Sequence, residues 1–278
     1  MSTASVRKAT WASSLWMVLC LGIVCCALQA SSSAASSVTI PDDYTVIQSA
    51  IDARIDTIYV RSVQIREDIV LTETVVLRGL DGPVVPEIGQ VYIQPSNDQP
   101  HGKYFEIGAL AIRGGIVANN RSDASRILLQ HCTVDGGLAD ISDRTETVSI
   151  VLRGCDIRDS VALFARSSAI VESCVVRGHL RAGSADLALL VKNSQFYGDG
   201  SGTAISDAGY EAIRNATILH NTIDGYVRGM ILRIDIVGRV ADNTIQNCTV
   251  SGIDLSDGDV TVEDNRINGC GTGIVVDS

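Results

Sequence analysis

A repeat of roughly 22 residues runs through the second half of the chain and limits the folds that it can adopt. Seven segments align on one small or polar residue, which we call the anchor position: Cys132, Cys155, Cys174, Ser194, Asn221, Asn243 and Asn265. Successive anchors are 23, 19, 20, 27, 22 and 22 residues apart. Segments of such similar length predict a solenoid, in which equal turns of the chain stack on one another.

Apolar residues stand at fixed distances from every anchor. Three residues before it lie Leu129, Leu152, Val171, Val191, Ile218, Val240 and Val262. Two residues after it lie Val134, Ile157, Val176, Phe196, Ile223, Ile245 and Ile267. Apolar residues that alternate within short runs predict strands with one buried face. Because each run is too short to bury that face alone, stacking at about 4.8 Å must build a shared core. The predicted fold class is therefore all-β, a single-stranded parallel β-helix.

The anchor side chains are expected to point inward at a bend between two strands. Asn221, Asn243 and Asn265 would then form a ladder, in which each amide bonds to its neighbours along the axis. The cysteines at the first three anchors would form a smaller ladder, and Cys248 and Cys270 a second one. A disulfide between stacked cysteines is the alternative. We favour reduced cysteines, because parallel side chains one coil apart give a poor disulfide torsion.

Two other solenoids fit the sequence less well. A helical solenoid needs amphipathic segments of about 10–15 residues, whereas the apolar runs between Ile127 and Ser278 are shorter and alternate. A leucine-rich repeat needs its own pattern of leucine and asparagine, which the sequence lacks.

Residues 1–37 have the features of a secretory signal peptide followed by a small-residue linker. Arg7 and Lys8 precede an uncharged apolar run from Leu15 to Leu28, and small residues follow from Ala30 to Ser37. We therefore expect a secreted, periplasmic or extracellular protein whose β-helix domain spans residues 38–278. The alternative is an uncleaved anchor, which would be the chain's one contact with a membrane.

The charge balance limits the partners of the domain. Removal of residues 1–37 changes the formal net charge from −10 to −12, which argues against nucleic acid and anionic lipid as ligands. It also argues against a strongly polyanionic glycan, unless local arginines or a bridging cation assist. Hydrophobic residues make up 46% of the chain and aromatic residues 4%, a balance that suits many thin layers. No cofactor motif and no zinc-type cluster of Cys and His stands in the sequence.

A short helix is expected to cover the N-terminal end of the core. Val46, Ile47, Ala50 and Ile51 form one helical face after a cap at Asp43 or Thr45. The β-branched run from Thr57 to Val60 then predicts the first strand. Residues 81–104 are rich in Pro, Gly, Asn and Asp and predict a loop excursion from an early coil.

The opening of the domain resembles the entry segment of pectinesterases and other members of the pectin-lyase-like superfamily. The similar pieces are the helix Ile47–Asp52 (IQSAID), the strand Thr57–Val60 (TIYV) and the segment Arg66–Leu71 (REDIVL). The coils around Asn221 and Asn243 resemble the general repeat of that superfamily. The resemblance covers about residues 38–278 and implies a right-handed parallel β-helix. It does not imply one activity, because the fold carries lyases, hydrolases, esterases, epimerases and proteins that are not enzymes.

The catalytic signatures of the superfamily are missing. The sequence lacks the Asp-Asp pair and the Gly-His-Gly of polygalacturonases, the Arg-x-Pro-x-x-Arg of pectate lyases and the Gly-Tyr-Gln-Asp of pectinesterases. The favoured function is therefore a non-catalytic protein that binds or organises polysaccharide at or outside the cell surface. A polysaccharide lyase, esterase or glycoside hydrolase with an unfamiliar site is the second hypothesis.

The resemblance implies that a glycan would lie along the strand face that follows the longest turn. In the last three coils the candidate strands are 229–233, 252–256 and 273–277. Arg233, Ser256 and Asp277 are expected in one solvent-facing row, with Asp254 beside them. Such a group suits a sugar acid, a bound cation such as Ca²⁺ or proton transfer. The alternative is an ordinary solvated strand face.

Two further expectations concern the surface. Arg153, Glu172 and Lys192 occupy one outward column and predict a charge ladder. The last strand ends inside a repeat without a capping helix, which predicts an open coil at the C-terminal end. A structural or assembly role, with self-association through this coil, is the third hypothesis.

Overall fold

The computed structural model describes residues 36–61, 64–80, 84–95, 102–119, 125–140, 148–164, 168–183, 186–207, 213, 215–233, 236–256 and 258–277. Ser37–Ser278 form one compact unit. The signal peptide and linker predicted over residues 1–37 lie, apart from Ser36 and Ser37, outside the described residues. Within the described part of the chain, no helix has the length and apolar character needed to cross a membrane.

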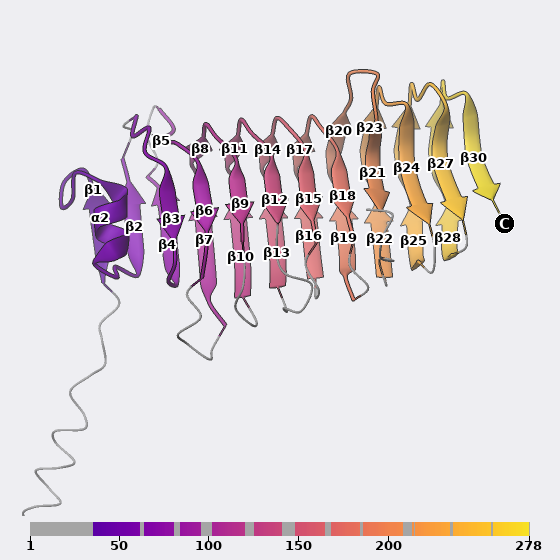
Figure 1. The fold of residues 1–278 in the computed structure, drawn as a ribbon. Helices are drawn as coiled ribbons and strands as arrows, with labels where there is room; N and C mark the ends of the chain where they lie inside the picture. Colours follow the sequence, from indigo (N-terminus) through magenta and orange to yellow (C-terminus); the bar gives the residue numbers. More distant parts are fainter. Residues whose placement is uncertain are drawn as a thin grey trace, which may run out of the picture. The chain divides into compact units, whose positions relative to one another are not determined.

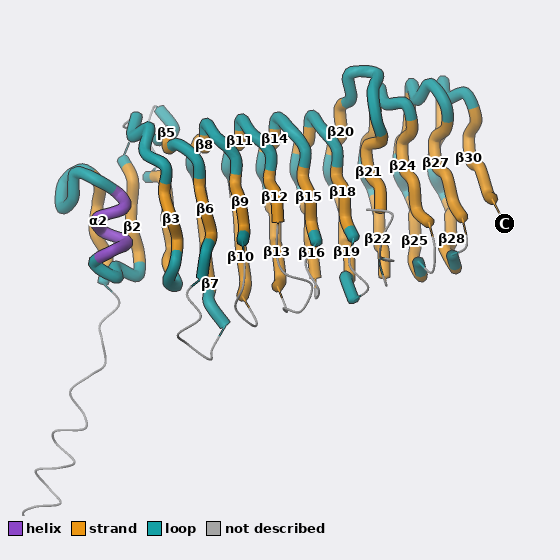
Figure 2. Tube along the Cα trace, viewed as in Figure 1, coloured by secondary structure: helices purple, strands orange, loops and turns teal. Residues whose placement is uncertain are grey.

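The unit is a solenoid in which each full coil contributes one strand to each of three parallel sheets, A, B and C (Figure 1). One coil, for example, consists of β10 (Ser125–Gln130), β11 (Thr133–Val134) and β12 (Leu138–Asp140). Figure 2 shows how short strands alternate with bends and loops along the whole unit. This all-β parallel architecture confirms the predicted fold class.

The three sheets have the following strands. Sheet A contains β1 (Ser37–Ile40), β2 (Thr57–Val60), β4 (Val75–Gly79), β7 (Tyr104–Gly108), β10, β13 (Val148–Arg153), β16 (Ser168–Glu172), β19 (Ala188–Lys192), β22 (Asn215–Leu219), β25 (Val237–Ala241) and β28 (Asp259–Glu263). Sheet B contains β5 (Glu87–Ile88), β8 (Ala111–Ile112), β11, β14 (Asp156–Ile157), β17 (Val175–Val176), β20 (Gln195–Tyr197), β23 (Thr222–Asp224), β26 (Thr244–Gln246) and β29 (Arg266–Asn268). Sheet C contains β3 (Ile69–Leu71), β6 (Val91–Ile93), β9 (Ile116–Ala118), β12, β15 (Val161–Leu163), β18 (Leu180–Ala182), β21 (Thr203–Asp207), β24 (Arg228–Arg233), β27 (Ser251–Ser256) and β30 (Thr272–Asp277).

The strand register confirms both apolar columns that the repeat predicted. The column before the anchor pairs Leu129 with Leu152 and continues without a slip to Val262 in sheet A. The column after the anchor runs in the same way from Val134 to Ile267 in sheet B. Their internal members are fully buried, so the short strands share one continuous core.

The repeat extends further towards the N-terminus than the anchor pattern indicated. Leu110 occupies the anchor position of the preceding coil, where a large apolar residue hid the pattern. The predicted loop over 81–104 is wrong for β5 and β6, because Ile88, Val91 and Ile93 are fully buried and pair with the next coil. The prediction that 57–60 is the first strand is also wrong, since β1 precedes it and pairs with it.

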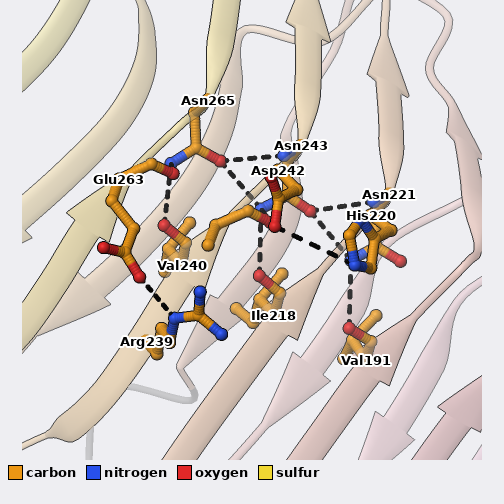
Figure 3. Close-up of polar contacts among 11 residues, drawn as sticks. Val191, Ile218, His220, Asn221, Arg239, Val240, Asp242, Asn243, Glu263 and Asn265 are labelled. Carbon is orange, nitrogen blue, oxygen red and sulfur yellow. Dashed lines mark hydrogen bonds and ion pairs between the residues drawn. The ribbon is translucent and has the colours of Figure 1, made fainter.

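The asparagine ladder is present at the last three anchors (Figure 3). Asn221 Nδ2 donates to Asn243 Oδ1 at 3.0 Å, and Asn243 Nδ2 donates to Asn265 Oδ1 at 2.9 Å. Each acceptor oxygen also takes a hydrogen bond from the backbone N–H of the preceding anchor, at 2.9 and 3.0 Å. The ladder therefore satisfies buried backbone and side-chain groups together at the bends of Asn221 and Asn243.

The residue before each anchor adopts the left-handed backbone conformation. These residues are Ala109, His131, Gly154, Ser173, Asn193, His220, Asp242 and Asp264, with φ between 52° and 61°. This conformation is costly for most side chains, and Asn and Asp tolerate it best after Gly. The bend between sheets A and B therefore has the same backbone geometry in each of these coils. The stacking of the coils imposes it on residues of different types.

The cysteine and charge columns are both as predicted. Cys132, Cys155, Cys174, Cys248 and Cys270 are free, which agrees with the favoured reduced state. Glu172 forms ion pairs with Arg153 at 3.0 Å and with Lys192 at 2.8 Å. All three charged side chains are partly solvated, so this ladder adds little stability.

The N-terminal cap differs in detail from the prediction. Helix α2 spans Ile47–Asp52, and Val46 is its N-cap residue, 39% exposed and without a capping side chain. Neither Asp43 nor Thr45 caps the helix. The carboxylate of Glu67 does so from another segment, accepting the N–H groups of Ile47 and Gln48 at 3.0 and 3.1 Å. Ile47, Ala50 and Ile51 cover the core as expected.

Candidate functional site

The outer face of sheet C is the candidate site, and its register places one outward-pointing residue of each strand in a single row. From β9 to β30 this row contains Val117, Ala139, Ala162, Arg181, Ser206, Ile231, Asp254 and Val275. The row is apolar over its first three strands. From β18 onward it contains the polar or charged Arg181, Ser206 and Asp254 together with the apolar Ile231, which is buried, and Val275. Two kinds of surface therefore follow each other along one face.

A groove of about 410 Å³ occupies the apolar part of this face. Its lining includes Val117, Ala139 and Ala162 in the row, and Gly115, Gly137 and Ser160 beside it. Glycine is required here, because a Cβ on Gly115 would lie 2.6 Å from the Gly137 carbonyl oxygen. A Cβ on Gly137 would lie 2.7 Å from the Ser160 carbonyl oxygen. The close approach of successive backbones thus makes the groove and keeps large side chains out of it.

The predicted row of Arg233, Ser256 and Asp277 is present in the register of β24, β27 and β30. The backbone N–H of Arg233 donates to Asp207 Oδ2 at 2.8 Å, a contact that the sequence did not indicate. Ser256 is partly exposed, and Arg233 and Asp277 are exposed. Whether this row binds a ligand stays a prediction.

Asp254 lies beside that row, as expected, but its ion-pair partner is Arg228. Arg228 Nε lies 3.0 Å from Asp254 Oδ2. The other carboxylate oxygen, Oδ1, is buried without a hydrogen-bond partner among the described atoms. Sequence reasoning missed Arg228, which lies at the start of β24 before the inward-facing Met230. The sequence feature that could have indicated Arg228 is its place at the first position of a predicted sheet C strand, close to the acidic residue of the next coil.

A second hollow, of about 330 Å³, lies beside the first coils and is lined in part by Arg54, Glu73 and Lys103. Lys103 is buried, and its Nζ lies 2.8 Å from Glu73 Oε2 and 2.9 Å from the Thr72 carbonyl oxygen. Its charge is therefore already paired, which makes this hollow a weaker candidate for an anionic ligand than the outer face of sheet C.

Of the histidines that the structure describes, His131 and His220 lie too far apart along the solenoid to share a metal ion. His131 and His220 share the column before the anchor but belong to coils that are four apart. His179 Nδ1 lies 2.9 Å from the Thr203 carbonyl oxygen, and its ring lies 5.9 Å from that of Tyr226. Among the described residues, no group of three or more His, Cys, Asp or Glu side chains is placed to hold a metal ion.

Comparison with known proteins addresses the fold. Residues 151–278 match the family described as right handed beta helix region. The fold is that of a right-handed parallel β-helix. No curated protein has a sequence that matches the chain. Among solved structures, the chain is similar to the A-module of the mannuronan C-5 epimerase AlgE6 from Azotobacter vinelandii. That match has 14% identity and a TM-score of 0.39, and it covers 82% of this chain and 90% of the module.

Proposed function

We propose that this β-helix repeat protein is exported and binds polysaccharide along the outer face of sheet C, at or outside the cell surface. The observation that carries the proposal is the register of sheet C, which places an apolar groove and a row of polar and charged side chains on one continuous face. Strands that repeat about every 4.8 Å offer the same contacts again and again, which suits a ligand that is itself a repeating chain.

The two parts of the face suit different parts of a sugar. Val117, Ala139 and Ala162 present C–H groups on which the face of a sugar ring can pack. Arg181 and Arg233 are exposed and present guanidinium groups, which suit hydroxyl and carboxylate oxygens. The strongly acidic protein would bind a polyanionic glycan through these arginines or through a bridging cation such as Ca²⁺.

A panel of neutral and uronic acid polysaccharides tests this proposal. Binding to residues 37–278 is measured by calorimetry, and the same mixtures are followed for the absorbance of unsaturated products. Ala139→Trp fills the groove and is expected to weaken binding at least about tenfold. Ala188→Trp, at the exposed first position of strand β19 in sheet A, is the matched control and should bind as the wild type does. No binding across the panel, or equal loss in both variants, would contradict the proposal.

A polysaccharide lyase, esterase or glycoside hydrolase is the second candidate. The Arg228–Asp254 pair favours it, because Asp254 keeps one buried carboxylate oxygen without a hydrogen-bond partner beside the exposed row. Turnover of a bound polysaccharide that is lost in Arg233→Ala and in Asp254→Asn, with unchanged circular dichroism, would support an enzyme. Binding without turnover in the wild type would support the non-catalytic function.

Export is tested separately from binding. We expect full-length chain expressed in a secreting host to appear in the medium or periplasm with residues 1–37 wholly or partly removed, which N-terminal sequencing of the recovered protein checks. Recovery of the intact chain in the membrane fraction would support the uncleaved anchor.

A further inference from the structure

The apolar groove on the outer face of sheet C has a defined length. Its row of Val117, Ala139 and Ala162 is bounded by Tyr92 of β6 at one end and by Arg181 of β18 at the other. Tyr92 is partly exposed and Arg181 is exposed, and both side chains are much larger than those between them. Four coil steps of about 4.8 Å separate Tyr92 from Arg181, so the row between them spans about 19 Å along the solenoid.

The floor of the groove offers few hydrogen-bonding groups to a ligand. The carbonyl oxygens of Gly115, Gly137 and Ser160 already accept backbone N–H groups of the preceding coil, at 3.1, 2.9 and 2.9 Å. The outward side chains of the row are aliphatic. A sugar hydroxyl that entered the groove would lose water without a replacement partner, which is unfavourable. An apolar group attached to the sugar would instead be stabilised by leaving water.

Two polar side chains at the rim of the groove indicate what else the ligand group must carry. Ser160 Oγ accepts the N–H of His179 at 3.3 Å, and within the described chain its own O–H has no acceptor. This hydroxyl can therefore donate to an oxygen of a ligand. Asp159 is exposed, and the residues that line the groove include no Lys or Arg. A carboxylate in the groove would be repelled by Asp159, whereas a neutral carbonyl oxygen would not be.

We propose that the polysaccharide bound on sheet C carries O-acetyl groups and that the groove receives them. An acetyl ester combines the two features that the groove requires. Its methyl group packs over Ala139 and Ala162, and its carbonyl oxygen accepts the hydroxyl of Ser160. The free hydroxyl groups of the sugar remain at the rim, where water and the exposed Arg181 can bind them. This inference rests on the proposed function, because it names the class of ligand for the same face.

Matched pairs of ligands test the inference. Each polysaccharide of the panel is partly O-acetylated with acetic anhydride, and a portion is then deacetylated with mild alkali to give a control of the same chain length. Calorimetry measures the binding of both forms to residues 37–278. We expect the acetylated form of a bound polysaccharide to bind at least about tenfold more tightly than its control. Equal or weaker binding of the acetylated form would overturn this inference and leave the proposed function intact, whereas absence of binding by every form would contradict both.

Two serine variants locate the acetyl group. Ser160→Ala removes the hydroxyl donor and should lower the affinity for the acetylated form about fivefold, with the affinity for the deacetylated form unchanged. Ser206→Ala, in the same outward row but outside the groove, is the matched control and should affect both forms alike. Both serines are partly exposed, so the fold should persist. The same preference for the acetylated form in Ser160→Ala as in the wild type, or its loss in Ser206→Ala, would overturn the inference.

Discussion

The side-chain amide of Gln48 forms two hydrogen bonds with the backbone of Val70, as a neighbouring strand would. The Val70 N–H donates to Gln48 Oε1 at 2.8 Å, and Gln48 Nε2 donates to the Val70 carbonyl oxygen at 3.2 Å. The helix α2 thereby covers the first strand of sheet C with a side chain as well as with apolar surface. Glu67, three residues before Val70, caps the same helix in return.

We expect Gln48→Ala to lower the free energy of unfolding by about 1–3 kcal/mol, because two backbone groups of β3 lose their partner. Urea unfolding followed by circular dichroism measures this. Gln195→Ala removes an exposed amide that bonds only to Tyr197 among the described contacts and serves as the control. An equal, small effect of both changes would show that water replaces the Gln48 amide without cost.

Asn243→Ala should be more damaging than Asn265→Ala. Asn243 accepts two hydrogen bonds from Asn221 and donates to the carbonyl oxygens of Ile218 and Ala241, all in buried surroundings. Removing it leaves several buried groups unpaired, at a cost of about 2–4 kcal/mol. Asn265 is partly exposed, so water can replace part of its bonds. Chemical denaturation of both variants and of the exposed Asn268→Ala tests this order.

Ser173 is one of the residues before an anchor that adopt the left-handed backbone conformation, and this predicts how it responds to substitution. Ser173 is exposed and has φ of 55°. Ser173→Gly should leave Tm unchanged or raise it, because relief of about 1 kcal/mol of backbone strain offsets the added freedom of the unfolded chain. Ser173→Val should lower Tm, since a β-branched side chain fits this conformation worst. Ser206→Val, on strand β21, is the control, and a similar loss there would contradict the explanation.

The surroundings of Glu106 predict that the free energy of unfolding decreases at acidic pH. Burial raises the pKa of this carboxyl, but hydrogen bonds from Tyr104 and Arg78 outweigh burial and hold the pKa below its usual value of 4.5. A lowered folded-state pKa gives stability that is present above pH 4.5 and is lost as the pH falls through the folded-state value. The unfolding free energy of Glu106→Gln should therefore fall less below pH 4.5 than that of the wild type. Asp259→Asn, which removes an exposed carboxylate, is the control for the change in net charge. If the unfolding free energy of Glu106→Gln fell with pH as steeply as that of the wild type, Glu106 would not be the source of the acid dependence.

The cysteines should differ sharply in reactivity. Cys270 is partly exposed, whereas Cys132, Cys155, Cys174 and Cys248 are buried. Burial, together with the neighbouring Cys270, raises the pKa of Cys248 to about 12, so this thiol stays protonated at pH 8. We expect iodoacetamide to modify Cys270 in native residues 37–278 at least about tenfold faster than the other four. Peptide mass spectrometry measures the rates, and fast modification of Cys155 would show that the coils open.

Much of the fold could be predicted from the sequence, because the repeat acts through local spacing. A residue such as Leu152 occurs three positions before its anchor whatever lies around it, and equal spacing in the next segment places Val171 beside it. The same logic indicated the ladder of Asn221, Asn243 and Asn265, the charge ladder of Glu172 and the row of Arg233, Ser256 and Asp277.

The sequence by itself determined which side chains share a column, since that depends on spacing along the chain. Contacts between different columns depended on the tertiary structure. Arg228 reaches Asp254, and Glu67 reaches α2, because bends and close backbones bring separate segments together. The groove over Ala139 arises in the same way, from glycines that let successive coils approach closely. The spacing of residues along the sequence does not predict such contacts, because they depend on the direction in which the chain turns between the sheets in each coil.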